Sequence, residues 1–338
     1  MVSHPEFGER TPGSEVAQIF RDRIRGKTIL ITGVSPKSIG QSTAVNIASQ
    51  APALLILASR TRNRVEEVAA DIKSKYPAAR IEIVILDLSS QSSIRQAVDE
   101  IKKLTSTLDI LINNAGIVVT SRQKTPEGIE LQFGTNHIGP FLLTNLLLPL
   151  LRNAAKTNPP GATRIVNLTS AGYRLSPIRF SDYNFEGKPV PPEEDHVKPL
   201  MGAFGKFTDD GYNGIVTYAQ SKTGNMLFTL HLQKVLAKYG IASYAVHPGS
   251  IVTDLSRDQS DELTEQFYKV APYWKTHDEG SSCTLVAALD PGLDEPKGHY
   301  LVDCQIFDPV AHGKDPVAAE RLWKLSEELV GQTFAFDD

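Results

Sequence analysis

A tyrosine and a lysine stand four residues apart in the stretch TYAQSKTGN, residues 217–225. Side chains at positions i and i+4 lie on the same face of a helix, so the Lys222 ammonium can approach the Tyr218 phenol. A phenol in water has a pKa of about 10, which is poorly matched to proton transfer at neutral pH. A nearby positive charge stabilises the phenolate and lowers that pKa. The pair therefore suits a general acid or base, although the same spacing also occurs by chance in many helices.

Short apolar runs alternate with longer amphipathic segments and predict the elements that position this pair. The apolar runs are 27–33, 53–59, 81–87, 109–116, 164–170 and 241–249. Unbroken apolar runs of this length are typical of strands that are covered on both faces. Helical patterns lie between them at 42–50, 63–76 and 92–104. This alternation predicts a doubly wound parallel sheet, and a last short strand at 299–303 is expected to close one edge.

The turn after the first apolar run, ITGVSPKSIGQSTA, is expected to open the first helix of the sheet domain. Gly33 allows a tight turn there, and Gly40 permits a close backbone approach at the helix start. Free N–H groups and the helix dipole at this end suit a pyrophosphate. The usual G-x-G-x-x-G spacing is absent, and such turns often carry glycines for packing alone. The turn by itself therefore leaves nucleotide binding open.

The end of the second predicted strand distinguishes between two dinucleotides. It reads LASRTRNR, with Ser59 and Arg60 where an NAD enzyme usually carries an acidic residue for the ribose hydroxyls. An arginine there accommodates a 2′-phosphate, and Lys37 in the glycine turn would add a second cation. This combination favours NADP over NAD. The alternative is a solvated basic helix start, which is the more plausible interpretation of Arg62 and Arg64.

Further segments complete a recognisable pattern together with YAQSK. They are NNAG (113–116), NHIGPFLLT (136–144), NLTSAG (167–172) and HPGSIVTDL (247–255). In this order they resemble the short-chain dehydrogenase/reductase family, over about residues 25–305. The segments LASR, NHIGPFLLT, YAQSKTGN and HPGSIVTDL are most similar to its retinol-dehydrogenase-like and WW-domain-oxidoreductase-like branch, and the TGVSP turn, the DYNFEGKPVPPEE insert and the N-terminal arm are similar to fungal members. The resemblance implies an α/β fold, a Rossmann-type doubly wound parallel sheet of about seven strands with helices on both faces.

The resemblance also implies hydride transfer between a nicotinamide cofactor and a carbonyl/alcohol pair. It makes Tyr218 the general acid or base and places Lys222 beside the phenol and the nicotinamide ribose. It assigns Ser170 to the substrate oxygen and Asn136 to a water that links the lysine to solvent. Taken singly, Ser170 could merely end a strand and Asn136 could be a surface amide.

The predicted cofactor contacts follow the carboxyl ends of the strands. The end of the third strand suits the adenine amino group, and the backbone after the Pro248-Gly249 turn suits the nicotinamide carboxamide, a role that the resemblance gives to Ile251 and Thr253. His247 is expected to pack rather than to catalyse, and no metal ligands are expected. The predicted cofactor-binding set is Gly33, Ser35, Lys37, Ser38, Ile39, Gly40, Ser59, Arg60, Asp87, Leu88, Asn114, Ala115, Gly116, Tyr218, Lys222, Pro248, Gly249, Ile251 and Thr253.

Two features depart from the family pattern. Ser38 stands one residue late at a position where a glycine is usual, which puts the local phosphate contacts in doubt. The segment 171–214, between Ser170 and Tyr218, is longer than the family pattern and rich in proline, glycine and aromatic residues. It is expected either to form a wall or lid of the substrate pocket or to pack as a small core of its own. Its aromatic residues, which would suit a bulky and partly apolar substrate, are Tyr173, Tyr183, Phe185, Phe204, Phe207 and Tyr212.

Composition limits the expected partners and location. The 338 residues carry a net charge of −4, which gives no support for nucleic acid or an anionic membrane as the main partner. Residues 1–25 lack the apolar core of a secretory signal, and the apolar run 141–151 is too short to span a bilayer. Cys283 and Cys304 lack metal-site spacing and are expected to be reduced thiols. A cytoplasmic location is therefore expected.

The chain is expected to comprise an N-terminal arm (1–25), a single domain (26–310) with an inserted loop (about 171–214), and a C-terminal helical tail (311–338). The predicted activity is an NADP(H)-dependent oxidation or reduction of a small or medium, partly apolar carbonyl or alcohol. Two alternatives remain: a non-redox protein that holds NADP on the same scaffold, and an NAD-dependent alcohol dehydrogenase. The substrate, the direction of reaction and the choice between monomer and homodimer stay open.

Overall fold

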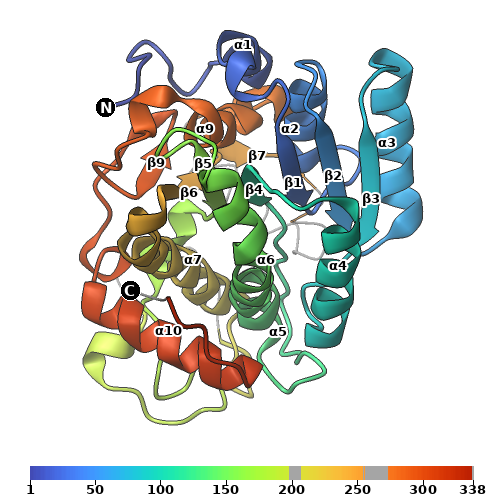
Figure 1. Cartoon of the computed structure of the whole chain (residues 1–338). Helices are drawn as coiled ribbons and strands as arrows, with labels where there is room; N and C mark the ends of the chain where they lie inside the picture. The colour runs from blue at the N-terminus through green and yellow to red at the C-terminus, as the bar shows by residue number, and fades with distance from the viewer. Residues whose placement is uncertain (198–206, 254, 256–272, 337–338) are drawn as a thin grey trace.

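A computed structural model describes residues 1–197, 207–253, 255 and 273–336. Its centre is an eight-stranded sheet in the order β10-β9-β6-β5-β4-β1-β2-β3 (Figure 1). The strands are β1 (Thr28–Thr32), β2 (Leu54–Ser59), β3 (Ile81–Ile85), β4 (Ile110–Asn113), β5 (Thr163–Leu168), β6 (Ile241–His247), β9 (Tyr300–Val302) and β10 (Gln305–Ile306). All neighbouring strands of this sheet run parallel except β10, which is antiparallel to β9. The predicted doubly wound α/β fold is confirmed.

The sheet has one strand more than the seven or so expected from the sequence. The additional strand, β10, follows β9 through a two-residue turn in which Asp303 and Cys304 both adopt left-handed φ angles of 48° and 64°. A two-residue strand has no periodicity that a sequence pattern could reveal. A separate parallel pair, β7 (Ser250–Ile251) and β8 (Trp274–Lys275), lies beyond the end of β6.

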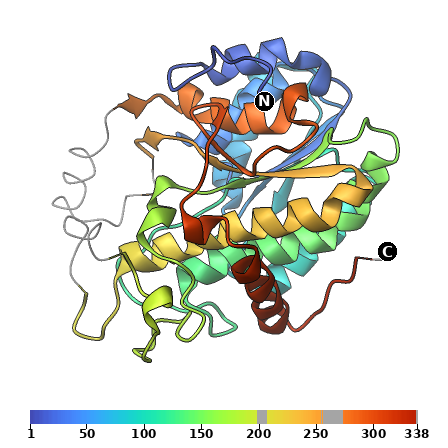
Figure 2. The same cartoon turned by 90° about the vertical axis from the view of Figure 1, so that its left-hand side faces the viewer.

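Helices cover both faces of the sheet, as the edge-on view of Figure 2 shows. One face carries α1 (Gly13–Ile19), α2 (Ile39–Ala48), α3 (Arg62–Lys75) and α9 (His277–Leu289). The other carries α4 (Gln91–Leu104), α6 (Gly139–Ala155), α7 (Gly214–Leu236) and α10 (Pro316–Val330). Short α5 (Leu131–Phe133) and a π-turn (Gly134–Ile138) lead into α6. Single 3-10 turns lie at Arg21–Arg23, Ala171–Leu175, Pro192–Glu194, Ala237–Tyr239, Pro291–Leu293 and Ala311–Gly313.

Strand β1 shows why the apolar runs are unbroken. Ile29 and Ile31 are buried in the core beneath α2 and α9, whereas Leu30 is buried in the core on the opposite face. Successive side chains of a strand point to opposite faces, so a sheet covered on both sides needs apolar residues at every position.

The two ends of the chain pack onto this sheet domain. The N-terminal arm buries Phe7, Val16 and Phe20 in the core on the α2 and α9 face. At the C-terminal end, the Trp323 ring of α10 lies 4.8 Å from the Phe141 ring of α6 and 4.3 Å from the His231 ring of α7. Burial of these large apolar side chains shows that both segments contribute to the stability of the domain.

The continuous helical stretch Leu131–Ala155 is 25 residues long, longer than the apolar run that the sequence singled out. By length and composition alone it could cross a membrane. Within the part of the chain that the structure describes it is a core helix, because 67% of its most apolar window is buried inside the protein.

Candidate active site

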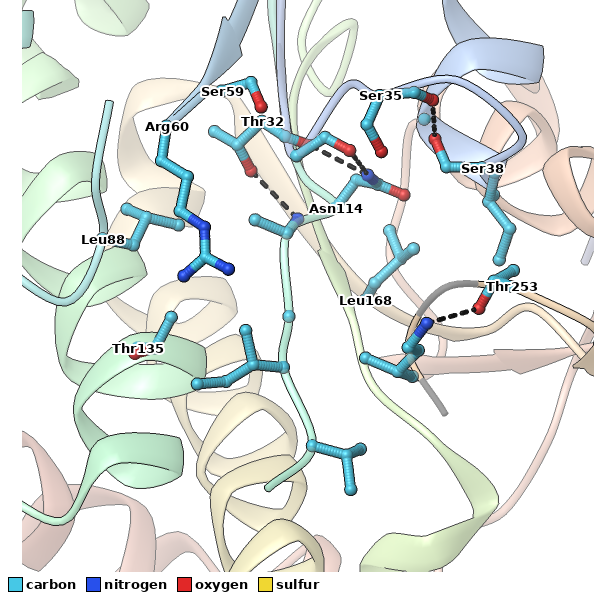
Figure 3. Close-up of a pocket in the computed structure, with 18 of the residues that line it drawn as sticks. Thr32, Ser35, Ser38, Ser59, Arg60, Leu88, Asn114, Thr135, Leu168 and Thr253 are labelled. Carbon is cyan, nitrogen blue, oxygen red and sulfur yellow. Dashed lines mark hydrogen bonds between the residues drawn. The ribbon is translucent and has the colours of Figure 1, made fainter. Parts of the chain in front are cut away.

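A cavity of about 410 Å³ lies along the carboxyl ends of β1, β2, β4 and β5 (Figure 3). Strand β1 has β2 on one side and β4 on the other, so the chain changes direction across the sheet at this point. Ligands of open α/β sheets bind at such a switch point. The volume is within the usual range for a small-molecule or cofactor site.

The glycines of the β1–α2 turn are required by close packing against the residues that follow β4. Gly33 has a φ of +73°, and a Cβ added there would lie 2.6 Å from the Cα atom of Ala115. A Cβ on Gly40 would lie 2.7 Å from Nδ2 of Asn114. That amide donates to the Thr32 carbonyl at 2.8 Å and thereby joins the two strand ends. The close backbone approach that the sequence predicts at Gly40 is therefore an approach to other atoms of the protein, those of the Asn114 side chain.

Replacing Gly33 by alanine is expected to destabilise the fold by about 1–3 kcal/mol more than the same change at Gly26. Both glycines have a φ of +73°, but a Cβ on Gly26 would have no heavy atom within 4 Å. The difference in the free energy of unfolding, measured with urea, isolates the clash with Ala115 from the cost of the left-handed backbone. Equal losses in the two variants would contradict the packing described here.

The N-terminus of α2 opens into the cavity. Ser38 caps the helix, since its hydroxyl accepts from the Gln41 N–H at 3.1 Å and donates to the Ser35 carbonyl at 2.6 Å. This cap starts α2 at Ile39, three residues before the helical pattern seen in the sequence. Ser35, Ser38, Ile39 and Gly40 line the cavity. Lys37 is exposed and does not line it, so the structure does not bring this predicted second cation to the site.

Two arginines stand at the end of β2. Arg60 is exposed and its guanidinium extends over the cavity in Figure 3, and Arg64 of α3 also lines the cavity. Arg62, between them, pairs with Glu66 at 3.5 Å on the outer side of α3. Arg60 thus lies in the cavity wall and Arg62 outside it, and the contact of Arg60 with a 2′-phosphate stays a prediction. The sequence interpretation of Arg64 as a solvated residue is corrected by its position in the wall.

The ends of β2, β3 and β4 contribute further parts of the cavity wall. Ser59, Asp87 and Leu88 lie in this wall, as do residues 114–116. The Asp87 carboxylate accepts from the backbone N–H and the hydroxyl of Ser89 at 2.9 and 2.7 Å. These bonds fix the loop after β3, so that the predicted adenine end has a defined shape.

Of the four predicted catalytic residues, Tyr218 and Lys222 lie in α7 and line the cavity. Ser170, two residues after β5 at the start of the 3-10 turn Ala171–Leu175, and Asn136 of the π-turn do not line it. Asn213 caps α7 by accepting from the backbone N–H groups of Ile215 and Val216 at 2.9 and 3.0 Å, which places Tyr218 in the first turns. Lys222 Nζ donates to the Leu168 carbonyl at the end of β5 at 3.1 Å. It lies 5.5 Å from the centre of the Tyr218 ring.

Burial shifts the pKa values of both members of this pair. Burial raises the pKa of Tyr218 to about 12, and a hydrogen bond from Ser170 opposes that rise. Burial lowers the pKa of Lys222 to about 8. In the protein without cofactor, burial sets the pKa of the phenol, because desolvation disfavours the phenolate and the Lys222 ammonium donates to the Leu168 carbonyl. The phenol is therefore protonated at neutral pH. The lowering expected from Lys222 together with the nicotinamide charge stays a prediction.

Asn136 is fully buried and is not a surface amide. Its Oδ1 accepts from the Ile117 N–H at 2.8 Å, and its Nδ2 donates to the Ile117 carbonyl at 3.0 Å and to Ser221 Oγ at 3.0 Å. The side chain thus holds the backbone of the cavity wall next to α7. Its role toward a water stays a prediction.

The segment after β6 enters the cavity only in part. Pro248 and Thr253 line it, whereas Gly249 and Ile251 do not. A Cβ on Gly280 of α9 would lie 2.9 Å from Cγ1 of Ile251, so this side chain packs on the helix. The carboxamide contact predicted for its backbone stays a prediction. His247 accepts from the Ala171 N–H at 3.3 Å, and burial lowers its pKa to about 4, as suits a packed neutral imidazole.

Several cavity residues were not identified from the sequence. They are Thr32, Thr61, Arg64, Leu86, Ile117, Val118, Val119, Gln123, Leu131, Thr135, Leu168, Thr169 and Leu255. Those at or just after strand ends could have been found from their position beside the predicted site. Residues 117–119 could not have been found from the sequence, because their segment has no periodicity. Only tertiary contacts place this segment in the cavity wall.

The described part of the insert 171–214 does not line the cavity. Phe185 and Tyr212 pack with Leu175, Ile215 and Val216 in a small separate core. Of the other aromatic residues named from the sequence, Tyr173 packs against Tyr300, Tyr183 packs near Phe133, Phe207 is 42% exposed, and Phe204 lies outside the described residues. For the described residues, the small-core alternative therefore applies.

Comparisons with known proteins agree with this geometry. Residues 27–184 match the family model "short chain dehydrogenase". The chain is 33% identical over 311 residues to mouse retinol dehydrogenase 11, covering 91% of this chain and 88% of the relative. It is 34% identical over 245 residues to the oxidoreductase fscI of Fusarium equiseti, covering 72% and 94%.

Solved structures give the same result for the fold. An uncharacterised protein from Mycobacterium paratuberculosis superposes with a TM-score of 0.64 at 29% identity, over 92% of this chain and 96% of that one. A short chain dehydrogenase from Burkholderia cenocepacia, solved in complex with NADP, gives 0.59 at 22% identity, over 83% and 97%. The second likeness bears on the fold alone.

The fold and the site define a Rossmann-type oxidoreductase, and the chain belongs to the short-chain dehydrogenase family. Within that family it is similar to the retinol dehydrogenases.

Proposed function

We propose that this protein interconverts a carbonyl and an alcohol on a small or medium, partly apolar substrate with NADP(H) as cofactor. The observation that carries the proposal is one cavity with Tyr218 and Lys222 at one end and Arg60 and Arg64 at the other. The residues present fit a dinucleotide, because the open N-terminus of α2 and its glycine turn lie between these ends. When bound, the nicotinamide supplies or accepts the hydride.

The residues of this chain supply the proton. In reduction, Tyr218 is protonated at neutral pH and donates to the substrate oxygen, while Ser170 holds the same oxygen beside the phenol. Lys222 is an ammonium below pH 8, and its charge favours the phenolate that remains. In oxidation, Tyr218 must first lose its proton, which its raised pKa opposes.

Replacing Arg60 by alanine is expected to weaken NADPH binding about tenfold or more and NADH binding less than twofold, because only NADPH carries the 2′-phosphate. Fluorescence titration of the reduced cofactors gives both dissociation constants. Arg62→Ala serves as the control, since that side chain is paired outside the cavity. Equal weakening of the two cofactors would favour the NAD-dependent alternative.

The pH dependence is expected to have opposite signs in the two directions. Reduction should slow as the pH rises through about 8, because Lys222 then loses the proton that makes it a cation. Oxidation should accelerate over the same range, because the phenolate of Tyr218 becomes more populated as the pH approaches its pKa of about 12. Initial rates between pH 6 and 10 at saturating cofactor test this. A reduction rate that rises through pH 8 would contradict it.

Apolar residues in the cavity wall support the proposed substrate class. The cavity is lined by the apolar residues Ile117, Val118, Val119, Leu131 and Leu255, so apolar groups on the substrate are favoured.

A cytoplasmic location is proposed from composition and would be tested by imaging a fluorescently tagged chain.

A further inference from the structure

Two buried amides, Gln132 and Asn136, stand four residues apart in the sequence, and each pairs with the backbone of one cavity-wall residue. Asn136 accepts from the N–H of Ile117 at 2.8 Å and donates to its carbonyl at 3.0 Å. Gln132 does the same with Val119: its Oε1 accepts from the N–H at 3.3 Å and its Nε2 donates to the carbonyl at 3.4 Å. In an antiparallel pair of strands, two facing residues can exchange both of their backbone hydrogen bonds. Each side-chain amide makes the corresponding two contacts with the backbone of one wall residue.

The same amides also reach α7, at the residues that precede the catalytic tyrosine and lysine. Gln132 Nε2 donates to Thr217 Oγ1 at 2.6 Å, and Asn136 Nδ2 donates to Ser221 Oγ at 3.0 Å. Each hydroxyl then donates to a carbonyl of the preceding turn of α7, at 3.1 and 2.7 Å. Gln132 Nε2 carries two hydrogens and also lies 2.9 Å from the Gly214 carbonyl, so its shorter contacts are to α7, and its firmer bond to the wall is the one that Oε1 accepts from the Val119 N–H. Each amide thereby joins the cavity wall to the catalytic helix.

The spacing of the elements allows this repetition. Four residues of α7 rise about 6 Å, so Thr217 and Ser221 lie about one helical turn apart, and Gln132 and Asn136 are likewise four residues apart in the sequence. Glycines permit the close approach at each level. A Cβ on Gly116 would lie 3.2 Å from Lys222 Nζ, and one on Gly214 would lie 2.2 Å from the Val119 carbonyl.

Tyr212, near the end of the insert 171–214, is hydrogen-bonded to Gln132 as well. Tyr212 Oη accepts from Gln132 Nε2 at 3.1 Å and donates to Glu130 Oε1 at 2.9 Å. Gln132, Glu130 and Tyr212 are all fully buried. Buried polar groups without partners are costly, so these bonds hold the wall and α7 in one arrangement.

We propose that Gln132 is a positioning residue that sets the distance between the cavity wall at Val119 and the helix that carries Tyr218. The inference rests on the proposed function, in which that wall orients the substrate carbonyl against the phenol. Gln132 touches no reacting group, and it acts through Val119 and Thr217.

The test compares Gln132→Met with Gln233→Met. Gln233 also lies on a helix that packs on the sheet, and its Nε2 donates to the carbonyls of Ser243 and Gly298 at 2.7 and 3.0 Å, near the far end of α7. With NADPH and a series of aldehydes from hexanal to decanal as probes, Gln132→Met should lower kcat/KM about tenfold or more and leave the Kd of NADPH within twofold. Gln233→Met should change neither by more than twofold. Equal effects of the two variants on kcat/KM would overturn the proposal.

A second variant and a second readout keep the test independent of folding and of turnover. Thr217→Val keeps the shape of the side chain and removes the hydroxyl, and it should lower kcat/KM in the same way. Amide hydrogen exchange of the segment 117–119 should be faster in Gln132→Met than in wild type and unchanged in Gln233→Met, whereas unchanged exchange in both would overturn the proposal. If wild type reduces none of these aldehydes and the exchange still shifts as expected, Gln132 holds the wall to α7, and only the choice of these aldehydes as substrates fails.

Discussion

Replacing Tyr218 by phenylalanine is expected to lower kcat for carbonyl reduction by about 100- to 10,000-fold and to leave the Kd of NADPH within twofold. The phenol is the proposed proton donor, it is protonated at neutral pH, and Ser170 directs a hydrogen bond to it. Phenylalanine keeps the ring in place beside Lys222 and removes only the oxygen. Steady-state rates of NADPH oxidation and a binding titration measure the two quantities.

The control for this variant is Tyr76→Phe, at the C-terminus of α3 and away from the cavity. It should leave kcat unchanged. Full activity of Tyr218→Phe would disprove the mechanism. Binding of NADPH without turnover in either protein would favour the non-redox alternative.

Replacing Arg164 by methionine is expected to destabilise the fold by about 3–5 kcal/mol, because the buried backbone carbonyls that it serves would lose a donor, while Arg23 would keep its pairing with Asp294. Arg164 lies in β5 and is fully buried. Its Nε, Nη1 and Nη2 donate to the carbonyls of Gly161, Ala287 and Asp290 at 2.8, 2.8 and 2.6 Å, and Nη2 also donates to Asp294 Oδ1 at 2.6 Å. The guanidinium therefore joins the sheet to the end of α9.

Chemical denaturation of wild type and Arg164→Met gives the free energies of unfolding. Arg62→Met is the matched control, since that exposed arginine makes one long contact to Glu66 on the surface of α3 and should leave the free energy unchanged. Similar losses in both variants would show that the buried network contributes little.

The catalytic and cofactor regions could be predicted because they depend on local order along the chain. Unbroken apolar runs mark strands covered on both faces, and parallel strands bring their carboxyl ends to one edge, so Ser59, Asn114 and Ser170 could be placed near one edge before any contact was known. The family resemblance added Tyr218. The outward direction of Lys37 could not be predicted, since it depends on a left-handed φ of 55° in an altered turn.

Other features depend on contacts between segments that are distant in the sequence. Gln132 has no motif, and its partners Val119 and Thr217 come from an irregular segment and from α7. The raised pKa of Tyr218 likewise follows from burial, which the i, i+4 spacing with Lys222 does not reveal. Residue order thus indicates which groups are present, while packing decides their protonation and their separation.

Transfer of deuterium from NADPH labelled at C4 of the nicotinamide tests the central claim most directly. The protein would be incubated with the labelled cofactor and a carbonyl-containing small-molecule extract of its source cells, and the products would be analysed by mass spectrometry. We expect wild type to place deuterium on the carbon that bears the new hydroxyl and Tyr218→Phe to place almost none. Absence of deuterium from every product of wild type, with NADPH bound, would contradict the proposed hydride transfer.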